Sequence, residues 1–273
     1  MTVSVLLPVR DGERYLREAL DSLLGESATD LEVVVVDDGS TDATPEILGS
    51  YADERLRVVA QGPEGLVAAL NRGLEETRGA TIVRMDADDV SLPSRLERQQ
   101  AVLGADERIG LVGCGFETID REGRTTGSWL LPEDDAALRR RLLLRNPFAH
   151  GSVAIRRAAL EAAGGYSADY GANEDYDLWR RIAREWCLAA VPEVLYRYRE
   201  HAEAVTKTDV GERVDSRERL RDELWSEPSL LGALGGERNA AEARALAREA
   251  IRRGRYRAAA RCLGDVLRAT TSS

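Results

Sequence analysis

Several residue types that mark large classes of protein are scarce in this chain of 273 residues. Its three cysteines, Cys114, Cys187 and Cys262, are too few and too widely spaced for a disulfide framework or a zinc site, so we expect small buried side chains. The chain has one lysine, Lys207, and its net charge is −10. Proteins that bind nucleic acid need a basic surface, and this charge argues against one.

Targeting and membrane-spanning signals are also missing. The first five residues, 1–5, carry no basic charge and do not resemble a signal peptide. No apolar run approaches the ~20 residues that a membrane-spanning helix needs. The sequence therefore predicts a cytoplasmic protein, and it leaves open both a homodimer and peripheral contact with the inner face of the membrane.

The two common glycine-rich signatures of nucleotide binding are absent as well. Neither Gly-x-Gly-x-x-Gly after the first predicted strand nor a Walker loop occurs. What the first 105 residues contain is an alternation of patterns, with strands at 3–7, 31–36, 56–60 and 81–85 and helices at 15–24, around 47–48 and at 66–77. Such alternation predicts a parallel sheet covered by helices on both faces.

The fourth of these strands runs into three carboxylates within four residues, Asp86, Asp88 and Asp89. Carboxylates that close repel one another and resist burial. A divalent cation resolves the conflict, because hard oxygen ligands suit Mg²⁺ or Mn²⁺. The alternative is a solvated acidic turn that caps the helix beginning near Pro93.

Polar residues follow three of the predicted parallel strands at the same edge of the sheet. The segments are Pro8-Val9-Arg10, Asp37-Asp38 and Asp86-Ala87-Asp88, and α/β sheets bind nucleotides at this carboxyl edge. A nucleotide here would be met by carboxylates and a metal ion, because no glycine cradle is present.

The rest of the chain mixes strands and helices and then becomes wholly helical. We predict helices at 95–103, 136–144 and 157–163 and from 174, and strands at 110–118, 127–131, 153–156, 188–191 and 194–199. From residue 208 arginine, glutamate and alanine dominate, and a hairpin of helices at 240–253 and 256–268 breaks at Gly254. The predicted domains are 1–206, with halves 1–105 and 106–206, and a helical C-terminal extension, 207–273.

Eight segments in order give the chain a resemblance to a known family. They are 3–12, 33–42, 71–73, 86–89, 150–152, 164–166, 173–179 and 198–201. Over residues 3 to about 206 the chain resembles the family 2 glycosyltransferases of the GT-A fold. The resemblance implies an α/β fold with a Rossmann-like, mostly parallel central sheet flanked by helices. It also implies a metal-dependent, inverting transfer from a nucleotide sugar.

The resemblance assigns donor-side roles. Asp88 would bind Mn²⁺ or Mg²⁺ bridging the diphosphate, and Asp86 would hold the ribose. Asp38 would accept a hydrogen bond from uracil, so a UDP-sugar is favoured. His201 would reach the metal or the diphosphate, with a surface histidine as the alternative. The remaining donor-site residues would be Pro8, Val9, Arg10, Asn71 and Ala87.

On the acceptor side the resemblance makes Asp175 the general base, and the neighbouring Glu174 would raise the pKa of the pair by repulsion. The alternative is that both are acids favoured by a helix N-terminus. His150 is expected to be structural or to face the acceptor. Trp179 is expected to lie in the core.

Several residues keep more than one interpretation. Asp89 supports the acidic pair or caps a helix, and Arg10 binds a phosphate or is solvated. The chain departs from the family at Arg10-Asp11, where an aromatic residue and asparagine are usual, and at Leu70, where arginine is common.

Two other functions stay open, a sugar-nucleotide pyrophosphorylase and a non-catalytic nucleotide-binding module. The sugar and the linkage are not predicted. The acceptor could be a lipid-linked saccharide, a polysaccharide, a peptide or a small metabolite, with synthesis of a cell-surface glycan as the expected setting.

Overall fold

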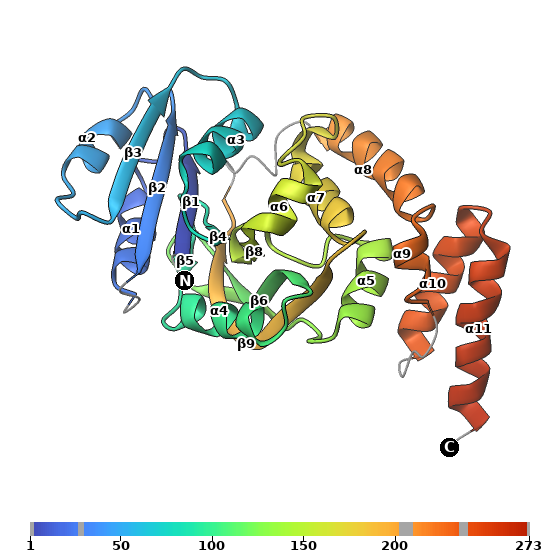
Figure 1. Cartoon of the computed structure of the whole chain (residues 1–273). Coiled ribbons are helices and arrows are strands. Elements are labelled where there is room, and N and C mark those ends of the chain that lie inside the picture. The colour runs from blue at the N-terminus through green and yellow to red at the C-terminus, as the bar shows by residue number, and fades with distance from the viewer. Residues whose placement is uncertain (1–2, 27–29, 202–209, 235–239, 272–273) are drawn as a thin grey trace.

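The computed structural model describes residues 3–26, 30–201, 210–234 and 240–271, and a nine-stranded sheet forms its centre (Figure 1). Four parallel strands make the first half in the order β3-β2-β1-β4, with bounds β1 Val3–Val9, β2 Leu31–Asp38, β3 Leu56–Gln61 and β4 Thr81–Arg84. The connecting helices are α1 Leu16–Leu24, α2 Thr44–Gly49 and α3 Leu66–Glu76. The predicted alternation of strands and helices in this half is confirmed.

Helices cover both faces of this half, which is why its strands are apolar. All of β1 is buried, and successive side chains of a strand point to opposite faces. Leu7 belongs to the same hydrophobic cluster as Leu20 of α1, and Leu6 to the same cluster as Leu70 of α3. The helix α3 approaches β1 so closely that a Cβ at Gly73 would collide with Leu6.

The second half of the sheet is mixed and follows the order β4-β8-β6-β9-β5, with β7 beside β6. Its strands are β5 Val90–Ser91, β6 Ile109–Ile119, β7 Thr125–Trp129, β8 Ala154–Arg156 and β9 Cys187–Arg199. Strand β8 is antiparallel to β4 and β6, whereas β9 is parallel to β6. The mostly parallel arrangement that was expected therefore holds for β1 to β4 and for the β6–β9 pair.

The two strands predicted at 188–191 and 194–199 form one continuous strand, β9. Its register against β6 shifts after Val191, so the exposed residues Pro192 and Glu193 bulge out of the ladder. Proline cannot donate a ladder hydrogen bond and is tolerated at a bulge. The sequence indicated a break because proline interrupts an apolar run in the same way whether the strand ends or bulges.

Helices also cover both faces of the second half. Helix α4 (Arg95–Ala105) contributes to one hydrophobic cluster. The other cluster contains α5 (Asp135–Leu144), α6 (Arg157–Ala163) and α7 (Glu174–Ile182). Two short 3-10 helices, η1 (His150–Ser152) and η2 (Gly171–Asn173), precede β8 and α7. Cys114 and Cys262 are buried as expected, and Cys187 is half-buried.

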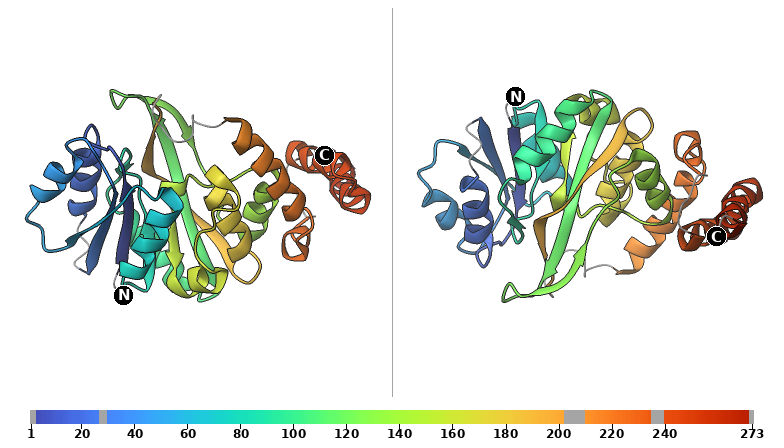
Figure 2. Two further views of the ribbon diagram at one scale, coloured as in Figure 1. Left: turned by 90° about the horizontal axis from the view of Figure 1, so that it is seen from above. Right: turned by 90° about the horizontal axis from the view of Figure 1, so that it is seen from below.

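The described C-terminal part is helical, as predicted, and lies at the end of the molecule opposite α2 (Figure 2). Its helices are α8 Val210–Leu224, α9 Pro228–Leu231, α10 Ala240–Arg252 and α11 Tyr256–Thr271. Gly254, with φ +69°, breaks the α10–α11 hairpin at the expected residue. The predicted domain boundary at 206 falls in 202–209, outside the described residues, so the division there stays a prediction.

Helix α8 contributes to the core of the second half. Leu220, Leu224 and Trp225 are fully buried in the same hydrophobic cluster as Leu138 of α5 and Tyr176 of α7. The α10–α11 hairpin packs outside α5 and α8 (Figure 1). Across the described residues, none of the helices combines the length and the apolar character needed to cross a bilayer.

Candidate active site

The polar segments after β1, β2 and β4 converge at the carboxyl edge of the sheet, as predicted. In the parallel registers Val9 lies opposite Asp37, and Leu6 lies opposite Arg84. The chain that leaves β4 therefore emerges beside the loop that follows β1. Pro8 and Val9 are buried inside β1, whereas the side chain of Arg10 is 52% exposed.

Asp38 is buried at this edge and organises the loop between β3 and α3. Its Oδ1 accepts hydrogen bonds from Gln61 Nε2 at 2.8 Å and from the backbone N–H of Glu64 at 2.9 Å, and its Oδ2 accepts from the N–H of Gly65 at 2.9 Å. A carboxylate has about four acceptor directions, so one is left for a ligand. Asp37 fixes the following turn, as expected, by accepting from the N–H of Ser40 at 3.0 Å.

Asp86 leaves β4 beside a buried arginine that the sequence analysis passed over. Arg84 is 2% exposed and forms an ion pair with Asp86. Burial lowers the pKa of Arg84, but attraction to Asp86 outweighs it and raises that pKa. The half-buried Ala87 packs against the cluster beneath α1. A charged residue inside an otherwise apolar strand was the signal for such a pair, because a buried charge needs a partner.

Asp88 and His201 meet although they are far apart in the sequence. Asp88 Oδ2 lies 2.8 Å from His201 Nε2, and the His201 ring lies against Tyr15 with centroids 5.5 Å apart. Burial and the nearby charge of Asp86 raise the pKa of Asp88, and His201 opposes this rise. The contact places His201 at the acidic segment, where the resemblance put it.

The side chains of Asp88 and His201 are suitable ligands for a divalent ion whose other ligands would be oxygens of a diphosphate. Within the described ranges no set of three or more His, Cys, Asp or Glu side chains is arranged around a metal position. Mg²⁺-type sites on nucleotides commonly use one or two protein ligands together with substrate phosphates. A carboxylate oxygen and an imidazole nitrogen also suit Mn²⁺.

Asp89 supports the acidic segment from behind. It is 1% exposed; its Oδ1 accepts from the N–H of Arg199 at 2.7 Å and its Oδ2 from the hydroxyl of Tyr196 at 2.6 Å. Burial, followed by the charges of Asp88 and Asp86, raises the pKa of Asp89 well above its usual value. The cap interpretation is wrong, because the partners of the Asp89 carboxylate are Arg199 and Tyr196, and the residue at the N-cap of α4 is Ser94.

Asp175 lies in the first turn of helix α7. Its Oδ2 accepts from Asn146 Nδ2 at 2.6 Å, and its Oδ1 accepts from the N–H of Tyr176 at 2.6 Å. Burial raises the pKa of Asp175 to about 6, Glu174 adds to the rise, and His150 opposes it. The sequence analysis named only Glu174 as the cause, whereas burial is the larger one. A carboxylate that titrates near neutral pH suits a general base.

The buried Glu174 belongs to a second polar group beside Asp175. Its Oε1 lies 3.5 Å from His150 Nδ1, and His150 Nε2 lies 3.0 Å from the hydroxyl of Tyr166. Trp179 is fully buried and meets the His150 ring edge-on, which confirms that it is a core residue. His150 thus lies beside the predicted base, although no motif in the sequence linked the two.

Asn71 holds a loop in place. Its Nδ2 donates to the carbonyl of Tyr166 at 2.9 Å, and its Oδ1 accepts from the N–H of Tyr166 at 3.0 Å. The contact ties α3 to the loop that carries the partner of His150. The donor-binding role of Asn71 stays a prediction. The sequence analysis gave no site role to Tyr166, although it lies in the segment 164–166 that carries the resemblance. It missed Asn146 and Tyr196, because nothing local distinguishes them from other turn or core residues.

Comparison with known proteins gives this geometry a context. Residues 4–164 match the sequence model of glycosyl transferase family 2. The chain is 32% identical over 222 residues to the putative glycosyltransferase EpsE of Bacillus subtilis (strain 168), which covers 78% of each protein. It is 28% identical over 214 residues to the O-antigen biosynthesis glycosyltransferase WbnJ of Escherichia coli, which covers 76% of this chain and 82% of that protein.

Two solved structures share the fold. S. aureus TarS 1–349, in complex with UDP-GlcNAc, has a TM-score of 0.69 at 18% identity and covers 97% of this chain and 89% of its own. Mannosyltransferase PcManGT from Pyrobaculum calidifontis, in complex with GDP-Man and Mn²⁺, has a TM-score of 0.62 at 23% identity and covers 98% and 75%. At these identities the likeness shows the fold alone, and it confirms the expected GT-A architecture.

Proposed function

The chain belongs to glycosyl transferase family 2, and on this premise we propose that it moves a sugar, with inversion, from a nucleoside diphosphate to an acceptor hydroxyl. Membership makes it a glycosyltransferase and decides against the pyrophosphorylase and the non-catalytic module.

One observation carries the proposal: η1 connects the donor-side acids to the predicted base. A Cβ at Gly151 would lie 2.8 Å from Asp86 Oδ2. The preceding residue, His150, lies 3.5 Å from Glu174, which adjoins Asp175. A sugar held between Asp86 and Asp175 would therefore have its leaving group on one side and its acceptor on the other. In-line displacement requires that arrangement.

On the donor side, the chain's own residues would bind and orient the nucleotide. The buried Asp38 keeps an acceptor direction for an N–H of the base, and the Pro8-Val9-Arg10 segment lies at the same edge of the sheet. Asp86 would hold the ribose. We favour UDP because a carboxylate complements the N3–H of uracil.

Asp88 and His201 would hold a divalent ion on the diphosphate. Such an ion supplies Lewis-acid neutralisation of the leaving group. Asp89 keeps this pair in place, since it binds the backbone N–H of Arg199, two residues before His201. Mn²⁺ or Mg²⁺ is proposed from the chemistry of this donor set.

On the acceptor side, Asp175 would take the proton of the attacking hydroxyl. A single displacement of this kind inverts the anomeric carbon. The pKa of Asp175, about 6, leaves its carboxylate largely ionised at neutral pH while keeping it basic enough to accept a proton. Glu174 would support Asp175 through the charge of its own carboxylate and through its contact with His150.

The cellular setting is proposed from the relatives. One of them is named for O-antigen biosynthesis, so we propose an acceptor in the synthesis of a cell-surface glycan. We also propose a cytoplasmic enzyme that contacts the inner face of the membrane peripherally. A lipid-linked glycan or a peptide acceptor, and a homodimer, are compatible with the proposal.

A thermal-shift series tests the donor and the ion together. The protein is heated with UDP, GDP or TDP, and with UDP-GlcNAc or GDP-mannose, each in MnCl₂ or in excess EDTA. We expect UDP and UDP-GlcNAc to raise Tm by roughly 5–10 °C at about 100 times Kd, and only with Mn²⁺. Equal stabilisation by UDP in EDTA would refute the ion assignment. A preference for GDP would refute the role given to Asp38, whereas a preference for TDP would refute only the choice of UDP, because thymine carries the same N3–H as uracil.

A further inference from the structure

The proposed function rests on the carboxylate of Asp175. This carboxylate is bound by the side chain of Asn146, which has no role in the mechanism proposed above. Asn146 Nδ2 donates to Asp175 Oδ2 at 2.6 Å, and the N–H of Tyr176 donates to Oδ1 at 2.6 Å. We infer that Asn146 is a positioning residue, which orients the Asp175 carboxylate and favours its ionised form.

The orientation of the Asn146 amide is fixed by a second contact. Its Oδ1 accepts from the backbone N–H of Phe148 at 3.2 Å, within the turn that contains Pro147. The opposite orientation would place the amide oxygen against a carboxylate and the amide NH₂ against an N–H. Only the observed one pairs each donor with an acceptor. Asn146 therefore presents an N–H to Asp175 because the local turn takes its oxygen.

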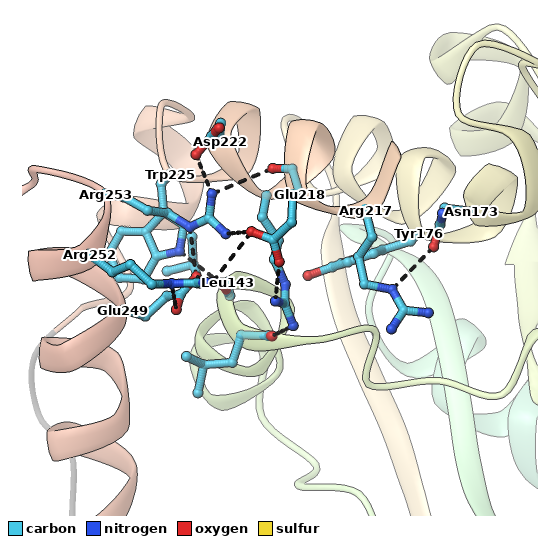
Figure 3. Close-up of polar contacts among 12 residues, drawn as sticks. Leu143, Asn173, Tyr176, Arg217, Glu218, Asp222, Trp225, Glu249, Arg252 and Arg253 are labelled. Carbon is cyan, nitrogen blue, oxygen red and sulfur yellow. Dashed lines mark hydrogen bonds and ion pairs between the residues drawn. The ribbon is translucent and has the colours of Figure 1, made fainter. Parts of the chain in front are cut away.

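Helix α8 holds both partners of this contact from behind. Trp225 Nε1 donates to the carbonyl of Leu143 at 2.9 Å, near the end of the helix that precedes Asn146 (Figure 3). Arg217 Nε lies 3.5 Å from Asn173 Oδ1, two residues before Asp175 (Figure 3). A hydrogen bond of 2.8 Å also joins Asn173 Nδ2 to Ser216 Oγ. Helix α8 and the adjoining Trp225 thus contact the chain close to Asn146 and close to Asp175.

Some of the groups around Asp175 raise its pKa and others lower it. Burial and Glu174 raise the pKa of Asp175, whereas His150, the N–H of Tyr176 and Asn146 lower it. The hydroxyl of Tyr166 lies 3.0 Å from His150 Nε2. Burial raises the pKa of Tyr166, Arg84 opposes the rise, and the charges of Glu174, Asp175 and Asp86 add to it. From α8, Arg217 reaches Asn173 and Arg221 donates to the carbonyl of Leu144. Asn146 supplies a side-chain hydrogen bond that specifically stabilises the carboxylate ion.

Two substitutions of Asn146 separate its contact with Asp175 from its contact with the backbone of the turn. In Asn146→Ser the hydroxyl can still accept from the N–H of Phe148, but it is too short to reach Asp175. In Asn146→Asp the turn contact is kept, and the donor becomes a second carboxylate. The carboxyl carbons of ¹³C-labelled aspartate are titrated by NMR, and Asp175→Asn identifies the signal.

We expect the pKa of Asp175 to rise by about one unit in Asn146→Ser and by more in Asn146→Asp, because the ion loses a donor and then also gains a like charge. A titration of Asp175 in Asn146→Ser that matches wild type would overturn the inference, since a residue that only shapes the turn would give that result.

Activity provides an independent readout. The probe is UDP-GlcNAc with MnCl₂, and release of UDP is followed as a function of pH. The rising limb should move to higher pH in Asn146→Ser by the same amount as the NMR titration, while affinity for UDP with Mn²⁺ stays at the wild-type value.

The proposed base and the inference about Asn146 fail in different ways. Near wild-type turnover by Asp175→Asn would refute the base, and the NMR titration would still decide the contact with Asn146. Loss of turnover in Asp175→Asn, combined with an unchanged pH profile and titration in Asn146→Ser, would leave the base standing and refute the role of Asn146.

Discussion

Asp38, Asp88 and Asp175 carry the same side chain in three environments, and at the residue scale this difference assigns their chemistry. Asp38 accepts three hydrogen bonds, Asp88 faces an imidazole beside other acids, and Asp175 is covered and held by one amide and one N–H. Burial raises the pKa of both Asp88 and Asp175, and the different partners of the three side chains suit the different roles proposed for them.

Substitution of Asp175 tests the proposed base. Asp175→Asn preserves size, but an amide cannot take up the acceptor proton at neutral pH. We expect transfer to fall by ~10² to 10⁴-fold with UDP affinity nearly unchanged. Steady-state kinetics and a binding titration with Mn²⁺ measure the two quantities. Asp88→Asn is the matched comparison, since it should weaken Mn²⁺-dependent UDP binding as well as turnover. Near wild-type transfer by Asp175→Asn would move the base to Glu174 or Asp177.

The pKa of Asp175 also predicts the pH dependence of the reaction. Burial raises this pKa to about 6, and only the ionised carboxylate can act as a base. The rate should therefore be low in acid, rise about tenfold per pH unit below pH 6, and level off above it. Initial rates between pH 4.5 and 8.5 with constant Mn²⁺ show the profile; a rate independent of pH in this range would contradict the assignment.

The raised pKa of Asp175 also predicts how the stability of the fold changes with pH. A carboxyl whose pKa is higher in the folded protein than in the unfolded chain stabilises the fold below the unfolded pKa, and this contribution is lost as the pH rises through 6. Asp175→Asn should accordingly unfold at a higher urea concentration than wild type at pH 7.5, and the difference should shrink at pH 4.

At the scale of elements, the most consequential feature is that α8 belongs to the core. Leu220 is fully buried against the second half of the sheet, while Val214 on the same helix is 50% exposed. Arg221 Nη2 also donates to the carbonyl of Leu144 at 2.6 Å. The helix therefore supports the end of α5, two residues before Asn146, and the η2 turn, which directly precedes α7 and Asp175.

This packing predicts a large effect at one position of α8 and a small one at another. Leu220→Ala should lower the free energy of unfolding by about 2–5 kcal/mol, because it removes buried methyl groups and leaves a cavity. Val214→Ala is the matched control and should change it by less than about 0.5 kcal/mol. Urea denaturation measures both. Equal, small effects would mean that α8 does not share the core.

At the scale of the whole molecule, the C-terminal extension divides into an inner and an outer part. The inner part, α8 and α9, covers Leu138 and Tyr176. The outer part, the α10–α11 hairpin, is joined to α8 by an ion-pair cluster in which Arg253 meets Glu218 and Asp222 (Figure 3). Arg253 is buried in this cluster, but Glu218 and Asp222 are 41% and 70% exposed, and pairs with exposed partners contribute little individually, so the hairpin should be the more dispensable part.

Two truncations test this division. A chain that ends at Leu234 lacks the hairpin, and we expect it to fold and to bind UDP with Mn²⁺, with Tm lowered by about 2–4 °C for each kcal/mol of packing lost. A chain that ends at His201 lacks α8 as well, and we expect it to aggregate, because the apolar surface of α5 and α7 would be exposed. Circular dichroism and the UDP thermal shift distinguish them. Folding and UDP binding by the shorter chain would refute the inner role of α8.

The sequence by itself determined the local elements, the family and the order of the motifs. An apolar run such as Val33–Val36 must be buried on both faces, and a helix such as α1 shows its buried side through its spacing. The acidic residues after β4 indicated a site because charges that close conflict with burial. These conclusions depend on neighbours within a few residues, and such neighbours are visible in the sequence.

The tertiary structure decided the contacts between distant segments. Asn146 and Asp175 are 29 residues apart, and Asp88 and His201 are 113 apart. The continuity of β9 through Pro192 depends on its pairing with β6, and the burial of α8 depends on the surface that α5 and α7 leave uncovered. A residue's own pattern shows whether it prefers to be buried. It does not show which surface will cover it, because that surface forms only when the whole chain packs.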